Sequence, residues 1–174
     1  MHDGENAAMK EFYTLYIDYL TGVCARYIDQ DDDLKDVLQD GIVKILTRIR
    51  EFNYRGPGSL QAWATRIVVN QSLSFLKNRQ RNGFASLVAD VPDEKEIDDP
   101  PIRDVPAEVI HQMVRELPEG YRMVFNLFVF ENKSHQEIAQ LLGIKKDSSA
   151  SQLHRAKNLL ARKIEMYNHS MEPR

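Results

Sequence analysis

Hydroxyl, amide and basic side chains recur along one side of a segment near residue 150 of this 174-residue chain. Ser148, Ser151 and Arg155 follow one another at steps of three and four residues, which places them on one face of an α-helix. Such groups bind base edges and phosphates when a helix enters the major groove of DNA. The candidate DNA-binding residues here are Lys145, Lys146, Ser148, Ser151, Gln152 and Arg155. A solvated face on an ordinary amphipathic helix fits the same pattern.

A second basic stripe lies on a predicted helix over residues 59–81. Its members fall within a roughly 80° arc of the helical wheel, with Trp63 at the edge. They are Arg66, Asn70, Ser74, Lys77 and Arg81. Basic groups and an amide can hold a nucleic-acid backbone, and an indole can stack on an unpaired base. A solvated helix face is again the alternative explanation for the stripe alone.

No arrangement of residues indicates catalysis or metal binding. The histidines are scattered along the chain, at His2, His111, His135, His154 and His169. Cys24 is the only cysteine, which excludes an internal disulfide and a cysteine-based zinc site. The sequence contains no glycine loop suited to phosphate and no evident pair of nucleophile and base. We therefore expect no enzymatic activity, no metal and no cofactor.

Two helices joined by a tight turn would position the first set of residues. Ser134 begins an apolar-periodic run and Glu137 follows three residues later, as in a capping box. Gly143 falls where a helix end needs a residue that tolerates positive φ. We expect Asp147 or Ser148 to cap the second helix, whose apolar stripe is Leu153, Ala156, Leu160 and Ile164. The segment predicts a helix-turn-helix.

The other periodic segments predict an all-α fold. Apolar residues recur at helical spacing over residues 8–28, 32–52, 59–81, 105–116 and 118–130. The first segment has a broad predicted core face of Phe12, Leu15, Tyr16, Tyr19, Leu20, Val23 and Tyr27. Pro118 is expected at the first helical position, N1, of the last segment. Residues 53–59 are rich in turn formers and predict a loop.

The formal net charge of −3 is concentrated in one short segment. Residues 82–106 contain 2 basic and 7 acidic side chains and four prolines, whereas residues 1–81 have net charge 0 and residues 107–174 have net charge +2. Proline removes backbone donors and like charges repel, so the segment predicts a flexible acidic linker. We expect two small helical domains, residues 1–81 and 107–174, on either side of it.

The apolar runs are short. Residues 67–76 form one of the longest stretches without a charged side chain, far below the ~20 residues that a membrane span requires. The first ten residues lack the basic start and apolar core of an export signal. Together with the single cysteine, these features predict a cytoplasmic protein without membrane insertion.

Three segments resemble extracytoplasmic-function (ECF) sigma factors, in the same order along the chain. Residues 33–44, DLKDVLQDGIVK, resemble the polymerase-binding helix of that family. Residues 52–70 look like its promoter-melting and −10-reading segment in region 2. Residues 117–119, with residues 134–157, look like its −35-reading region 4. The resemblance covers nearly the whole chain outside the linker, and three such motifs in order are specific.

The resemblance implies a bacterial initiation factor that binds core RNA polymerase and directs it to particular promoters. Residues 1–81 would be region 2 and residues 107–174 would be region 4. The polymerase would be contacted by Asp33, Asp36, Gln39 and Asp40. The −10 element would be contacted by Asn53, Tyr54, Arg55, Trp63, Arg66, Asn70, Lys77 and Arg81, and the −35 element by Lys145, Lys146, Ser148, Ser151, Gln152 and Arg155.

The resemblance also implies an anti-sigma protein as a partner, and the apolar Val129 and Phe130 are a candidate seat for it. Two positions depart from the family: Ser149 is apolar in many relatives, and Ala150 is often basic there. A dimeric helix-turn-helix regulator is an alternative that would explain residues 134–157 but not residues 33–81. It predicts tight binding to a palindrome without polymerase, whereas a sigma factor should bind very little.

Overall fold

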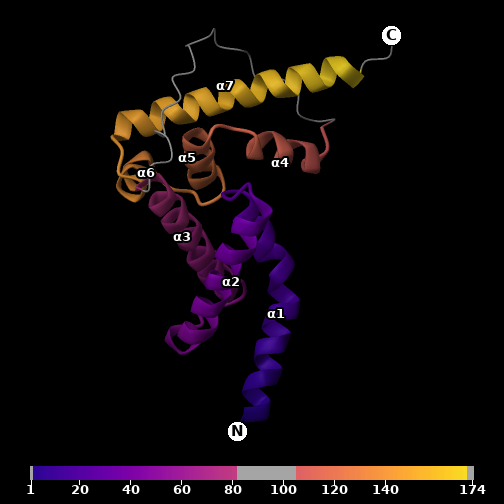
Figure 1. The fold of residues 1–174 in the computed structure, drawn as a ribbon, viewed down its shortest axis with the longest axis vertical. Helices are drawn as coiled ribbons and strands as arrows, with labels where there is room; N and C mark the ends of the chain where they lie inside the picture. The colour runs from indigo at the N-terminus through magenta and orange to yellow at the C-terminus, as the bar shows by residue number, and fades with distance from the viewer. Residues whose placement is uncertain (1, 82–104, 172–174) are drawn as a thin grey trace. The chain divides into compact units, whose positions relative to one another are not determined.

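The computed structural model describes residues 2–81 and 105–171, with side chains placed for residues 6–79 and 105–171. The chain divides into two compact units, Met1–Gly83 and Phe84–Arg174. Every regular element in the described ranges is helical, which confirms the predicted all-α fold (Figure 1). Most of the predicted linker, residues 82–104, lies outside the described residues.

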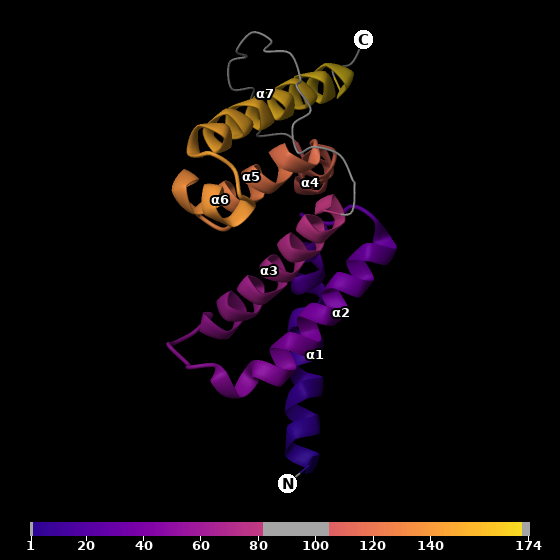
Figure 2. The same cartoon turned by 60° about the vertical axis from the view of Figure 1, so that its left-hand side comes forward.

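The first unit packs three helices around one core. Its elements are α1 (His2–Ala25), α2 (Asp31–Arg48), the 3-10 turn η1 (Ile49–Glu51) and α3 (Ser59–Arg81). α2 and α3 lie side by side in opposite directions, and α1 packs against both (Figure 2). Leu20, Ile45 and Leu76, one from each helix, are 0% exposed. A Cβ on Gly41 would lie 3.3 Å from Cγ2 of Val68, so glycine allows α2 and α3 to approach closely.

Two details of the first unit differ from the sequence prediction. Leu15 is 65% exposed and Tyr19 is 42% exposed, so the core face of α1 is narrower than predicted. At about 100° per residue, both side chains lie beside the buried stripe of Leu20 and Val23 rather than within it. The helix predicted over residues 32–52 also ends early, because α2 stops at Arg48 and the chain continues in the tighter turn η1.

The second unit contains α4 (Ala107–Arg115), α5 (Glu119–Val129), α6 (His135–Leu142) and α7 (Lys146–Met171). The long α7 packs on the other three helices (Figure 1). A core of Val114, Leu117 and Tyr121 meets Ala156 and Leu160 of α7.

The predicted start of α5 was wrong by one position. Pro118 lies at the N-cap instead of N1, and its φ of −50° already suits the helix that follows. The first helical residue is Glu119, whose carboxylate complements the positive end of the helix dipole.

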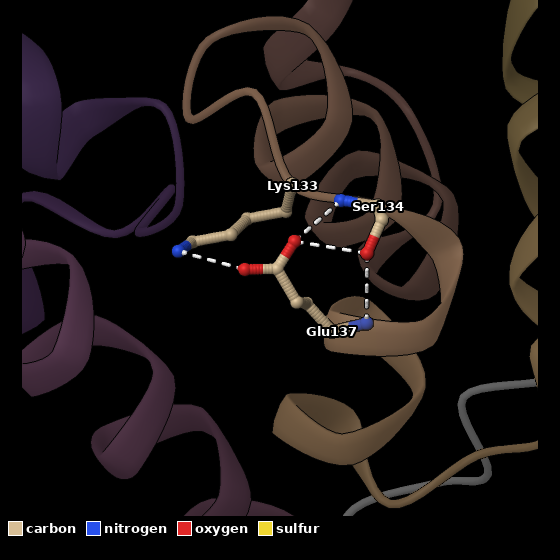
Figure 3. Close-up of polar contacts among 3 residues, drawn as sticks. All are labelled: Lys133, Ser134 and Glu137. Atoms are coloured by element: carbon tan, nitrogen blue, oxygen red, sulfur yellow. Dashed lines mark hydrogen bonds and ion pairs between the residues drawn. The ribbon is translucent and has the colours of Figure 1, made fainter.

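The predicted helix-turn-helix is present as α6 and α7. The Glu137 amide donates a hydrogen bond to Ser134 Oγ at 3.3 Å, and the Ser134 amide donates to Glu137 Oε2 at 2.9 Å (Figure 3). This reciprocal pair is the predicted capping box. Lys133 Nζ lies 3.4 Å from the other oxygen of the Glu137 carboxylate. Gly143 ends α6 with φ of 69°, in the left-handed region that the prediction required.

The cap predicted for the second helix was wrong. α7 begins at Lys146, so Asp147 and Ser148 lie inside the helix. The backbone amide of Ser149 donates to the carbonyl of Lys145 at 3.1 Å, which makes Lys145 the capping position. Asp147 still stabilises the first turn, since its carboxylate lies at the positive end of the helix dipole.

Candidate nucleic-acid interface

One face of α7 is polar and the opposite face is buried. The predicted apolar stripe is 0 to 8% exposed, and it consists of Leu153, Ala156, Leu160 and Ile164. Among the predicted DNA-binding residues, Lys145, Lys146 and Ser151 are exposed, and Ser148 and Arg155 are half-buried. α7 can therefore present ammonium, hydroxyl and guanidinium groups to a ligand while its apolar stripe remains in the core.

Gln152 and Ser149 lie on the buried side of α7. Gln152 is 7% exposed, although the sequence placed it at the flank of the polar face. Its position on the helical wheel is about 40° from Ala156, which explains the burial. Ser149 is 0% exposed and lies four residues before Leu153, so helical spacing could have identified it as a core position.

The polar stripe of α3 lies on its exposed side. The exposed members are Arg66, Asn70, Ser74 and Lys77, and Arg81 is the last residue of the helix. Trp63 at the edge of the stripe is half-buried, and its ring packs on Phe52 with 5.4 Å between ring centroids. The stripe therefore runs along α3 as predicted, with an indole held in place near its start.

The loop before α3 exposes the three side chains that the sequence selected. Asn53, Tyr54 and Arg55 are exposed, with Tyr54 at 72%. Gly56 and Gly58 have φ of 114° and 80°, values that strongly favour glycine. The chain can therefore turn sharply into α3, and Tyr54 is left open to stack on a flat ligand.

The four polar residues selected on α2 differ in their contacts with α3. Asp33 and Asp40 are held by α3: Arg79 Nη1 lies 3.6 Å from Asp33 Oδ2, and Gln71 Nε2 donates to Asp40 Oδ2 at 3.0 Å. The remaining two, Asp36 and Gln39, are exposed, as is Asp40. α2 therefore offers an outward polar face whose two ends are fixed to the neighbouring helix.

Sequence reasoning missed Gln71, which lies on α3 between the polar stripe and the core. Its amide oxygen accepts a hydrogen bond from Lys44 Nζ while its amide nitrogen donates to Asp40. The two α2 residues are four positions apart, on one face of the helix. Gln71 thus orients a carboxylate and an ammonium group together.

The fold also brings together His135 and Ser149, which are 14 positions apart in the sequence. Ser149 Oγ lies 3.0 Å from Nδ1 of His135, and the imidazole stacks on the Phe128 ring with 4.9 Å between centroids. A serine beside a histidine can act as a nucleophile. Ser149 is 0% exposed, however, so a substrate cannot reach it.

Other features bear on membrane, metal and thiol chemistry. Within residues 2–81 and 105–171, no helix combines the length and the apolar character that a membrane span needs. The same residues contain no group of three or more His, Cys, Asp or Glu side chains that could hold a metal ion.

Cys24 is buried with Sγ 3.6 Å from Ser72 Oγ. Burial raises the pKa of the Cys24 thiol, and the hydrogen bond to Ser72 offsets only part of that change.

Comparison with known proteins gives two family matches that span most of the chain. Residues 12–82 match the family described as Sigma-70 region 2, and residues 107–160 match the family described as Sigma-70, region 4. The first match contains α2, the loop and α3, and the second contains the helix-turn-helix.

Individual relatives align along nearly their whole length. The chain is 24% identical over 173 residues to the RNA polymerase sigma-H factor of Pseudomonas aeruginosa, covering 93% of this chain and 89% of the relative. It is 23% identical over 176 residues to the ECF RNA polymerase sigma-E factor of Haemophilus influenzae, covering 95% of this chain and 92% of the relative.

A solved structure shares the fold. The sigma factor RpoE, in complex with the anti-sigma factor NepR from Bartonella quintana, matches with a TM-score of 0.52 and 18% identity, covering 90% of this chain and 96% of that chain. Three findings agree on one family: the order of the two matched regions, the polar faces of α3 and α7, and the relatives that align over nearly their whole length. The chain belongs to the sigma-70 family of bacterial RNA polymerase sigma factors, as an ECF-type factor that directs promoter-specific transcription initiation.

Proposed function

We propose that the chain reads promoter DNA at two places, with α7 in the major groove of the −35 element and α3 with its preceding loop on the melted −10 element. The observation that carries the proposal is the same in both units: a helix buries its apolar side and leaves a polar stripe exposed. A sigma factor does no covalent chemistry, so binding groups on rigid helices are sufficient for this function. The chain accordingly has no proposed enzymatic activity or cofactor.

Each domain has a separate proposed role. Residues 1–81 serve as region 2, which binds core polymerase and the −10 element, and residues 107–174 serve as region 4, which binds the −35 element. Residues 82–106 tether them. A tether suits two weak DNA surfaces, because polymerase fixes their spacing and raises the effective concentration of each.

The −35 contact uses the polar face of α7. Ser151 and the half-buried Arg155 are the groups best placed to meet base edges, with Ser148 beside them. Lys145 and Lys146 lie at the start of the helix, where ammonium groups can hold phosphates. Gln152 has a smaller proposed part, because its burial leaves little of the amide accessible.

The −10 contact combines the loop and α3. Tyr54, with Asn53 and Arg55, is proposed to capture an unstacked base, which offsets an unstacking cost of a few kcal/mol. Trp63 supports this site beside the separated strands. The backbone of the melted strand would follow the exposed Arg66, Asn70 and Lys77 toward Arg81, the last residue of α3.

The polymerase contact is the outward face of α2. Asp36 and Gln39 are exposed and would meet a basic partner surface directly. Asp33 and Asp40 flank them, each held in one orientation by a side chain of α3. Polar groups that are already oriented lose less side-chain entropy on binding.

An anti-sigma protein is the proposed regulatory partner, in a cytoplasmic setting. Val129 and Phe130 at the end of α5 are 47% and 41% exposed. The rings of Phe130 and Phe125 are in contact, with 6.3 Å between their centroids. An exposed apolar strip of this kind suits a protein partner. Val129→Asp should weaken capture by such a partner without changing the affinity for core polymerase.

Run-off transcription with purified core polymerase, over a library of promoters that vary in both elements, tests the proposal. The expected result is initiation that depends on the added chain and on specific bases at −35 and −10. Tight binding to a palindrome without polymerase would instead support a dimeric regulator. Initiation sites that do not change when the chain is added would contradict the proposal.

A further inference from the structure

The contact between α6 and α7 includes a polar pair, the half-buried His135 and the buried Ser149. His135 is the first residue of α6, and Ser149 lies in the first turn of α7. Their Nδ1 and Oγ atoms are 3.0 Å apart, and the Phe128 ring stacks on one face of the imidazole with 4.9 Å between ring centroids. Three elements of the second unit therefore meet at this one hydrogen bond.

A hydroxyl group at this place needs a specific reason. Burying a hydroxyl without a partner is unfavourable, whereas an alanine or valine would fill a core position at no such cost. Apolar contacts are non-directional, so Leu153 and Ala156 alone would tolerate a small rotation of α7 about its axis. A hydrogen bond restricts both distance and angle, and it therefore fixes the rotation of α7 about its axis.

Ser149 is also close in sequence to the groups proposed to meet DNA. It directly follows Ser148 and precedes Ser151 by two residues, all on one rigid turn of helix. A rotation of α7 at Ser149 displaces these two hydroxyl groups and Arg155 by the same angle. Base contacts depend on donor and acceptor geometry, so they respond to such a rotation more strongly than phosphate contacts do.

We propose that His135 and Ser149 are a positioning pair whose hydrogen bond sets the rotation of the recognition helix α7 and thereby its choice of −35 sequence. Ser149 does not itself touch DNA, because it is 0% exposed. This inference rests on the proposed −35 contact of α7.

The test measures discrimination rather than activity. Holoenzyme assembled with the full-length chain transcribes a cognate promoter and promoters with single base changes at −35. Each rate is divided by the rate on a pre-melted template that lacks the −35 element. Ser149→Ala should reduce the ratio of cognate to altered promoter about tenfold, the effect of losing one good side chain–base contact. His135→Asn, whose amide can replace Nδ1 in the hydrogen bond, should keep most of the ratio.

Two further variants separate positioning from stability. Ser149→Ala leaves the half-buried imidazole without its partner and should lower the melting temperature. The double variant His135→Phe with Ser149→Ala replaces the polar pair with apolar groups. It should therefore restore the wild-type melting temperature but not the wild-type discrimination ratio. Ser170→Ala removes an exposed hydroxyl far along the same helix and serves as the matched control. If the double variant recovers both quantities, or if Ser149→Ala and wild type discriminate equally, the pair only packs the core. If wild type itself does not discriminate at −35, the proposed function fails instead.

Discussion

At the scale of single residues, Glu137 links local hydrogen bonding to pH. The Ser134 backbone amide, then the Ser134 hydroxyl, holds the pKa of Glu137 below its ordinary value. Because the pKa is lower in the folded state, the ionised carboxylate contributes its full stabilisation above the unfolded-state pKa of about 4.3. This contribution is lost as the pH falls through the lower folded-state pKa. The melting-temperature difference between wild type and Glu137→Gln should be constant above about pH 5 and shrink below it.

Thermal unfolding followed by circular dichroism between about pH 3 and pH 7 measures that difference. Glutamine keeps an acceptor for the Ser134 amide, so the comparison isolates the charge. A difference that grows on acidification would show that the carboxylate is not stabilised by the capping box.

Arg155 is the residue of α7 with the clearest proposed base contact. Arg155→Ala should cost about 1 to 3 kcal/mol at a cognate −35 element if the guanidinium binds a guanine. Run-off transcription across −35 variants at several salt concentrations measures this loss and its dependence on sequence and salt. Lys157→Ala is the matched control, because Lys157 is basic and exposed but lies on the other side of the same helix. A loss that is uniform across sequences and changes only the salt dependence would assign Arg155 to phosphate.

At the scale of elements, the turn between α6 and α7 depends on one glycine. Gly143 has φ of 69°, and an L side chain there costs about 1 to 2 kcal/mol. Gly143→Ala should lower the free energy of unfolding by that amount in urea, and Gly143→Asn should lower it less, because asparagine tolerates this region. Gly22→Ala is the contrasting variant: Gly22 is exposed within α1 with nothing near its Cβ position, so alanine should stabilise the protein.

The outward face of α2 predicts a binding defect that is separate from folding. Asp36 is exposed, so Asp36→Lys should leave the melting temperature nearly unchanged. It should weaken core polymerase binding about tenfold by placing a like charge against a basic surface. Fluorescence anisotropy of a labelled chain titrated with core polymerase measures the affinity, and Asp18→Lys on α1 controls for net charge. Unfolding of the Asp36 variant would mean that the carboxylate is structural.

The elements show which features could be predicted from sequence. Ser134, Glu137 and Gly143 act through neighbours within four residues, so their roles were visible in the spacing. Gln71 and the pair of His135 with Ser149 act between helices, and no local pattern places two helices against each other. The same reason explains the error at Leu15, which has helical spacing although no helix in the described part of the chain covers it. The two polar stripes were predictable because exposure on one side follows from burial on the other.

At the scale of the whole molecule, the acidic segment between the two domains predicts a salt-dependent effect. Its clustered carboxylates lie outside the described residues, at Asp93, Glu94, Glu96, Asp98 and Asp99. We expect them to oppose DNA binding by the free chain through simple repulsion. Substitution of all five by Asn or Gln should strengthen polymerase-free binding to promoter duplexes at low salt. The gain should disappear near 1 M salt, where the Debye length is about 3 Å. Equal binding at low salt would reject the hypothesis.

Cys24 has a practical consequence for experiments on the intact molecule. It is the chain's only cysteine, it is 0% exposed and burial raises the pKa of its thiol. Maleimide reagents should therefore spare the native protein, and the natural thiol can remain in place. Two cysteines introduced on the surface, one in each unit, would accept spin labels or fluorophores selectively. Their separation would then report how the units move when polymerase engages them.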